Sequence, residues 1–137
     1  MKLNFKKIIL MILGIFAGII FLFIGKANLT DNSEKVVLNI DGRDYVLFMA
    51  KTALEKTRGL SGITELKGAD GMIFYFEPVQ KLIFWNKNTH LDLELIWMKS
   101  GEIVGRDFLP SEDEAGLIIK TSPEEVDLVV ELVKSRF

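Results

Sequence analysis

Apolar and polar residues alternate strictly in the segment from Thr89 to Met98. The apolar positions are Leu91, Leu93 and Leu95, and the polar positions between them are His90, Asp92 and Glu94. Because successive side chains of an extended chain point to opposite faces, this pattern predicts a half-buried strand with one polar face. The turn Asn86-Lys87-Asn88 separates this strand from an apolar segment at 81–85. We therefore expect the two segments to lie side by side in one sheet.

The predicted domain begins with a hairpin. Residues 35–40 and 43–49 are rich in β-branched and aromatic residues, and the dipeptide Asp41-Gly42 between them suits a type I′ turn. Further strands are predicted at 72–76, 81–85, 102–108, 117–120 and 124–133. Pro78 is expected to end the strand at 72–76, because proline has no amide hydrogen to donate to a sheet ladder.

One short helix is predicted among these strands. Thr52 and Glu55 have the spacing of a capping box, and Gly59 follows where a helix of about two turns would end. Residues 109–116 are rich in acids and are expected to form an exposed loop. Because no helical pattern of about 12 residues separates the strands, residues 35–137 are expected to form a mainly β domain. The predicted fold is a mainly antiparallel β-sandwich or barrel with one short helix.

The first 27 residues differ from this domain. Residues 8–24 are apolar and uncharged, and as a helix they reach about 25 Å, near the lower limit for spanning a bilayer. Three lysines precede the run, so residues 1–27 predict a signal anchor or transmembrane helix with a cytoplasmic N-terminus and an extracytoplasmic domain. A cleaved signal peptide, cut near Gly25-Lys26-Ala27, is the alternative and would give a secreted domain. The polar residues 28–34 are expected to be a linker.

Composition and charge exclude several classes of site. The chain has 137 residues and no cysteine, which excludes disulfides and thiolate sites. It has 17 basic and 19 acidic residues, and four of the basic residues lie at or before Lys26, so 13 basic and 19 acidic residues follow, a net charge of −6. An acidic domain is a poor partner for nucleic acid. With a single histidine, His90, we predict no metal site and no cofactor.

Four residues could together hold a small ligand. Arg58 and Lys87 supply positive charge, Trp85 supplies a flat face for stacking, and Asn88 can both donate and accept hydrogen bonds. This set predicts a polar pocket for an anionic or sugar-like ligand. In the alternative, Trp85 belongs to the core and Lys87-Asn88 only forms a turn.

Several blocks of sequence, in this order, carry a family resemblance. They are Ala50-x-Thr52-x-x-Glu55-x-x-Arg58-Gly59-Leu60, Asp70-Gly71-Met72-Ile73-Phe74-x-Phe76, Phe84-Trp85-x-Lys87-Asn88-Thr89 and Ser122-Pro123-x-x-Val126-Asp127. They resemble the domain-of-unknown-function 192 family over about residues 36–133. The resemblance implies a compact, mainly β, jelly-roll-like domain of a kind that is commonly exported or membrane-anchored, with no established activity. The family's polar positions correspond here to Glu55, Arg58, Trp85, Lys87, Asn88 and Glu94, and Asn86 stands where the family usually has methionine.

The function expected from these features is a binding or accessory module, in which Glu94 positions Lys87 or accepts a ligand hydroxyl. An envelope hydrolase with Glu55 or Glu94 as general base is one alternative. A structural domain that acts through a protein–protein surface is the other. A buried carboxylate of raised pKa in a deep pocket would favour catalysis, and an ion-paired carboxylate on an open face would favour binding or a structural role.

Overall fold

The computed structural model describes residue 29 and residues 33–134 of the chain. The predicted membrane span at residues 8–24 and the predicted cleavage site lie outside this part, as does most of the linker. Among the helices within the described residues, none is both long enough and apolar enough to cross a bilayer.

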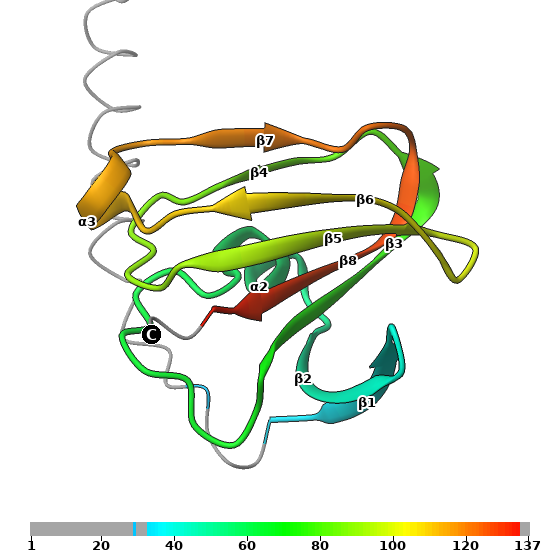
Figure 1. The fold of residues 1–137 in the computed structure, drawn as a ribbon, viewed down its shortest axis with the longest axis horizontal. Helices are drawn as coiled ribbons and strands as arrows, with labels where there is room; N and C mark the ends of the chain where they lie inside the picture. The colour runs from blue at the N-terminus through cyan, green and yellow to red at the C-terminus, as the bar shows by residue number, and fades with distance from the viewer. Residues whose placement is uncertain (1–28, 30–32, 135–137) are drawn as a thin grey trace, which may run out of the picture.

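The described strands form one large sheet and one small sheet (Figure 1). The large sheet has six strands in the order β1 (Lys35–Ile40), β2 (Arg43–Ala50), β3 (Gly71–Gln80), β8 (Val126–Val133), β5 (Leu93–Lys99) and β6 (Glu102–Leu109). The small sheet pairs β4 (Ile83–Trp85) with β7 (Ile119–Thr121). The prediction of a mainly β domain is therefore confirmed, although the strands of the described region do not close into a barrel.

Two details of the predicted architecture are wrong. Strands β2 and β3 pair in parallel, because the chain crosses over through helix α2 (Ala53–Arg58) between them, and every other strand pair in the described part is antiparallel. The segment predicted as an exposed loop contains a second short helix, α3 (Glu112–Ala115).

The predicted pairing around the tryptophan turn is also wrong. Strand β4 pairs with β7, whereas β5 pairs with β6 and β8, so the two arms of the turn belong to different sheets. Strand β5 begins only at Leu93, and His90 and Asp92 therefore do not share a strand face with Glu94. Polar contacts explain the late start, since the Asp92 carboxylate accepts a hydrogen bond from the Ser111 amide at 2.9 Å and so holds this segment against the loop before α3.

Pro78 does not end β3 as predicted. The strand continues to Gln80, but its pairing with β8 is interrupted between Tyr75 and Gln80. Pro78 lies inside this interruption, where no ladder hydrogen bond requires its missing amide hydrogen.

The hairpin and the helix cap follow the sequence prediction. Asp41 and Gly42 both have positive φ, 53° and 84°, as a type I′ turn requires. The Thr52 hydroxyl accepts a hydrogen bond from the Glu55 amide at 3.1 Å, and the Glu55 carboxylate accepts one from the Thr52 amide at 2.8 Å, which completes the capping box.

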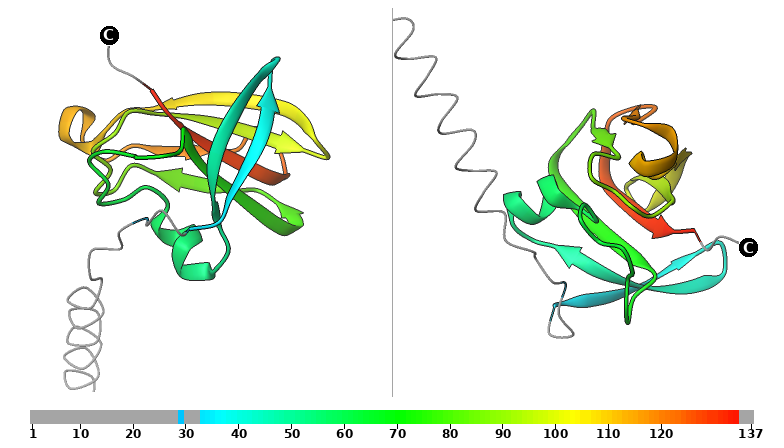
Figure 2. Two further views of the ribbon diagram at one scale, coloured as in Figure 1. Left: turned by 90° about the horizontal axis from the view of Figure 1, so that it is seen from below. Right: turned by 90° about the vertical axis from the view of Figure 1, so that its left-hand side faces the viewer.

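The central strands bury side chains on both faces of the large sheet. On one face, Phe84 of β4 packs edge-on against Phe74 and Trp97, with ring centroids 5.2 and 5.5 Å away. On the other face a second cluster includes Ile73 and Ile96, and the β1–β2 hairpin bends over it (Figure 2). Both sides of β8, of β5 and of residues 71–74 of β3 are therefore largely removed from water, whereas the second half of β3 is mostly exposed.

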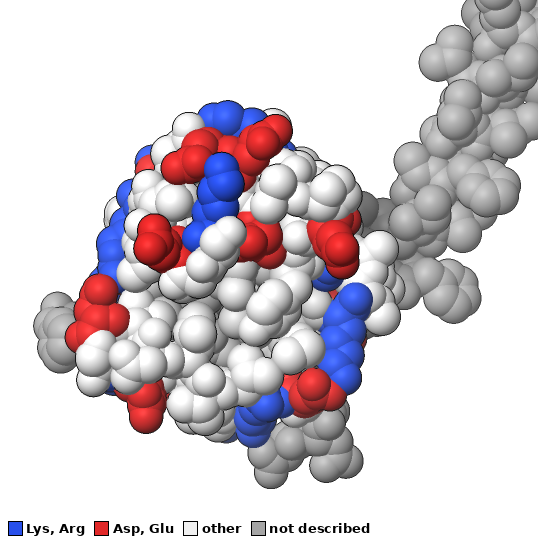
Figure 3. Space-filling view, turned by 90° about the vertical axis from the view of Figure 1, so that its right-hand side faces the viewer, with Lys and Arg blue, Asp and Glu red and all other residues white. Residues whose placement is uncertain are grey.

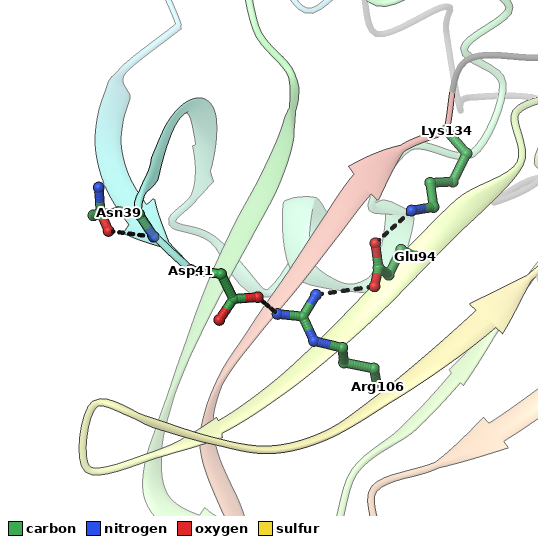
Figure 4. Close-up of polar contacts among 6 residues, drawn as sticks. Asn39, Asp41, Glu94, Arg106 and Lys134 are labelled. Atoms are coloured by element: carbon green, nitrogen blue, oxygen red, sulfur yellow. Dashed lines mark hydrogen bonds and ion pairs between the residues drawn. The ribbon is translucent and has the colours of Figure 1, made fainter.

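Ion pairs connect the hairpin to the far edge of the sheet. Arg106 of β6 lies between Asp41 at the hairpin tip and Glu94, and Lys134 contacts the second oxygen of Glu94 at 2.7 Å (Figure 4). On the side of the molecule shown in Figure 3, charges of both signs are mixed and surround uncharged residues. That face presents no extended basic field of the kind that nucleic acid requires.

Candidate functional site

Two hydrogen bonds join the segment that follows helix α2 to the turn after β4. The Ser61 hydroxyl donates to the carbonyl of Lys87 at 3.0 Å, and the Gly62 amide donates to the carbonyl of Asn88 at 2.7 Å. On the other side of the helix, Lys56 donates from its ammonium to the carbonyl of Tyr75 in β3. These contacts place the last turn of α2 opposite β4.

A cleft of about 270 Å³ lies between these elements. Its lining comes from α2, β3, the β4 segment and β8, and consists of Lys56, Thr57, Arg58, Gly59, Phe76, Leu82, Ile83, Phe84, Trp85, Lys87, Thr89 and Glu131. A volume near 300 Å³ is at the lower end of the range for small-molecule sites. The structure thus brings together Arg58, Trp85 and Lys87, three of the predicted site residues, around one cavity.

Three cations and several aromatic rings surround the cleft. We call Lys56, Arg58 and Lys87 the cationic rim. The Lys87 ammonium lies 5.7 Å from the ring centre of Trp85, and that of Lys56 lies 5.1 Å from the ring centre of Phe76. Within the described part of the chain, the Arg58 guanidinium forms no hydrogen bond or ion pair, which leaves its fork of donors available to an anion.

Glu131 lines the same cleft from strand β8. It is only 4% exposed, and its Oε2 has no hydrogen-bond partner among the described residues. Its neighbours on the adjacent strands are Met72 of β3 and Leu95 of β5, so apolar side chains flank it in the sheet. A buried polar atom without a partner is costly and unusual in a folded protein.

The surroundings of Glu131 change its acidity. Burial raises the pKa of this carboxyl to about 8, and a hydrogen bond from the Leu60 amide lowers it by less than burial raises it. At neutral pH the group is therefore mostly protonated, and it can donate a hydrogen bond as well as accept one.

Gly59 allows helix α2 to end directly above this carboxyl. It has a φ of +52°, which favours glycine, and a Cβ atom built there would lie 3.0 Å from Glu131 Oε2 and 3.4 Å from Phe74. Both the backbone conformation at position 59 and the closeness of Glu131 therefore favour glycine there.

The other three predicted site residues lie outside the lining. Glu55 is exposed and caps α2, and hydrogen bonds from the Thr52 and Lys51 amides lower the pKa of its carboxyl. Asn88 has a φ of +53° and uses its backbone in the turn, where its amide donates to the carboxylate of Glu112. Both residues therefore position the elements around the cleft and do not line it.

Glu94 lies on the opposite face of the large sheet. In the register of β5 against β8, Leu95 is paired with Glu131 on the cleft side, whereas Glu94 is paired with Leu132, which belongs to the core cluster of the other face. Burial works to raise the pKa of Glu94, but hydrogen bonds from Lys134 and Arg106 outweigh it and lower the pKa overall.

Sequence reasoning missed two buried polar residues here. Glu131 is an acid between the apolar residues Val130 and Leu132 in a segment predicted only as a strand, and the apolar residues around it were the available signal. Asn86 is fully buried and its side chain bonds to Pro110, Gly116 and Ile118, at 2.9, 2.8 and 2.7 Å. No local pattern distinguishes such an asparagine from an exposed turn residue.

The described residues contain no group of three or more metal-ligating side chains close enough to share an ion. His90 instead contacts the carboxylate of Asp113 at 2.8 Å.

Comparisons with known proteins identify a family and a fold. The model of the DUF192 family, described as "Uncharacterized ACR", matches residues 36–137. No curated protein matches the chain. A crystal structure from Sinorhizobium meliloti 1021, of a protein described provisionally as a transcription regulator, is similar with 26% identity and a TM-score of 0.58 over 71% of this chain and 76% of that one. A protein of unknown function from Novosphingobium aromaticivorans DSM 12444 shares the fold, with 21% identity and a TM-score of 0.51 over 80% of this chain and 87% of that one.

Proposed function

Because this chain belongs to the uncharacterised DUF192 family, which supplies no activity, we propose a function from the geometry alone. The domain is a binding module that holds a small anionic or sugar-like ligand in the cleft between α2 and β4. The observation that carries this proposal is the position of Arg58, Trp85 and Lys87 on the lining of one cavity. Two cations can hold an oxyanion, and the half-exposed indole can stack on a ring.

Binding accounts for the arrangement better than hydrolysis by the carboxylates that the sequence suggested. A general base for that chemistry needs a carboxylate in the cleft with a raised pKa. Glu55 and Glu94 lie outside the cleft, and the pKa of each is lowered. Both therefore fit structural roles. Glu131 is the carboxyl that lies in the cleft with a raised pKa, and because it is mostly protonated at neutral pH it fits a hydrogen-bond donor to a ligand better than a general base.

Transcription regulation, the description attached to one similar structure, is not carried over to this chain. Beyond Lys26 the chain has a net charge of −6, from 13 basic and 19 acidic residues, and such a domain repels the phosphate backbone. Binding a small ligand in the cleft requires no contact with a phosphate backbone.

Titration calorimetry with three probes tests the proposal. Benzoate presents a ring and a carboxylate, sulfate presents an oxyanion alone, and glucose presents hydroxyls alone. We expect saturable binding of at least one probe, and about tenfold weaker binding of an anionic probe by Arg58→Gln, since a charge-assisted hydrogen bond contributes roughly 1.5–3 kcal/mol.

Arg43→Gln is the matched control. Arg43 is an exposed arginine of β2 that packs on Tyr45 and does not line the cleft, so this variant should keep the wild-type affinity. Equal weakening in both variants, or no saturable binding of any probe by the wild type, would contradict the proposal.

We also propose that residues 8–24 anchor the domain on the outer side of a membrane, because the run is apolar and follows three lysines. Expressed in bacteria, the full chain should remain with carbonate-washed membranes and be digested by protease added to spheroplasts. A variant lacking residues 8–24 should be recovered in the soluble fraction and should be protected from the added protease. Identical fractionation of the two proteins would contradict the anchor.

A further inference from the structure

We propose that Glu131 is a ligand-binding residue of the cleft and that its protonated carboxyl donates a hydrogen bond to an oxyanion held by the cationic rim. The ligand would then be a small molecule with a carboxylate or a sulfate- or phosphate-like group. This inference rests on the proposed function and narrows the ligand to anions.

The first argument is the unused hydrogen-bonding capacity of Glu131. The residue is only 4% exposed, yet Oε2 lacks a partner within the described residues. The other polar contact of the carboxyl is with the Leu60 amide. Since Glu131 also lines the cavity, a ligand there can supply the missing partner.

The second argument is the charge of the surroundings. Helix α2 contributes Lys56 and Arg58 to the lining, and the turn after β4 contributes Lys87. The strands on either side of β8 face Glu131 with Met72 and Leu95, which do not titrate. An incoming ligand therefore meets three cations, a field that attracts anions and repels amines.

The third argument is that Glu131 does not already form an ion pair with the two cations that α2 contributes to the cationic rim. In the described structure neither Lys56 nor Arg58 forms an ion pair with this carboxyl, although these three residues line one cavity of about 270 Å³. An oxyanion between them would accept hydrogen bonds from both sides, from the cations and from the acid. A carboxylate in place of the acid would instead repel the ligand.

The pH dependence of benzoate binding tests this assignment, because benzoate stays ionised throughout the range used. Between about pH 6.5 and pH 9.5 the wild-type affinity should fall about tenfold or more as Glu131 loses its proton. Glu131→Gln keeps a donor of the same shape that does not titrate, and its affinity should change less than about threefold. Sulfate, titrated in parallel, shows whether binding requires a carboxylate or accepts any oxyanion.

Glu94→Gln is the control, since Glu94 lies on the other face of the sheet and should leave the pH profile unchanged. Loss of affinity with pH in wild type and Glu94→Gln, but not in Glu131→Gln, supports the assignment. A flat wild-type profile, or an equal fall in Glu131→Gln, overturns it while leaving the proposed function intact. Failure of the wild type to bind any probe at the lower pH overturns the proposed function itself.

Discussion

Glu131 is a carboxylic acid placed among apolar side chains of a central strand. Its burial has a consequence for stability that is separate from any ligand. Between its ordinary pKa of 4.5 and its raised pKa of about 8, the folded protein holds a proton that the unfolded chain has released. Stability therefore falls as the pH rises through this window and levels off above it.

Glu131→Gln should remove this dependence, because glutamine is neutral at every pH. The variant should match the wild type near pH 5 and exceed its free energy of unfolding near pH 9 by an amount on the order of 3–5 kcal/mol. Urea unfolding at the two pH values measures the difference. A constant difference between the two proteins would show that Glu131 does not titrate in this range.

Gly59 is constrained by the same carboxyl. Gly59→Ala should destabilise the fold by more than Gly116→Ala, with a difference of about 1 kcal/mol. Both glycines have positive φ, +52° and +68°, but only at Gly59 would the added Cβ approach other atoms within 4 Å, among them Glu131 Oε2 at 3.0 Å. Thermal unfolding of the two variants compares them, and equal losses would mean that Glu131 and Phe74 move aside.

At the scale of elements, the sequence correctly predicted the β1–β2 turn and the cap of α2, because each depends only on residues close together in the chain. The Asp41-Gly42 turn needs only two residues of positive φ, and the α2 cap needs only Thr52 and Glu55. The pairing of β4 with β7 and of β5 with β8 could not be predicted, because the paired residues are 30 or more positions apart in the chain. The site shows the same division. Arg58 and Lys87 were predicted from residue type, whereas Glu94 was misplaced because the alternation of β5 does not show which face of the strand lies under the cleft.

Asn86 links the turn after β4 to the α3 segment through three side-chain hydrogen bonds and is fully buried. Asn86→Ala should lower the free energy of unfolding by about 2–4 kcal/mol, because it leaves three backbone groups without partners. Asn39→Ala is the matched control: its side-chain bonds are exposed in the hairpin, so the loss should stay below about 1 kcal/mol. Equal losses in urea unfolding would contradict the role of Asn86.

At the scale of the whole molecule, the two faces of the large sheet serve different purposes. One face, under β4 and α2, carries the cleft and Glu131. The other is covered by the β1–β2 hairpin and joined by the Asp41–Arg106–Glu94–Lys134 network (Figure 4). We therefore expect changes in this network to affect stability and to leave the cleft intact.

Arg106→Gln should cost about 1 kcal/mol of stability at low salt and less in roughly 1 M NaCl, because partly exposed ion pairs are weak and screened. Lys67→Gln, which removes an exposed pair with Glu65, should cost nothing measurable. Unfolding curves at the two salt concentrations test this, and affinity for benzoate should be unchanged in both variants. A loss of benzoate binding in Arg106→Gln would show that the two faces are coupled.

Mapping benzoate on the folded protein by proton–nitrogen correlation spectra tests the central claim most directly. The account predicts saturable shifts concentrated at residues 56–60, at residues 82–89 and at Glu131, with little change at Glu94 and Arg106. Shifts spread over the surface, or centred on the face that carries Glu94, would contradict it.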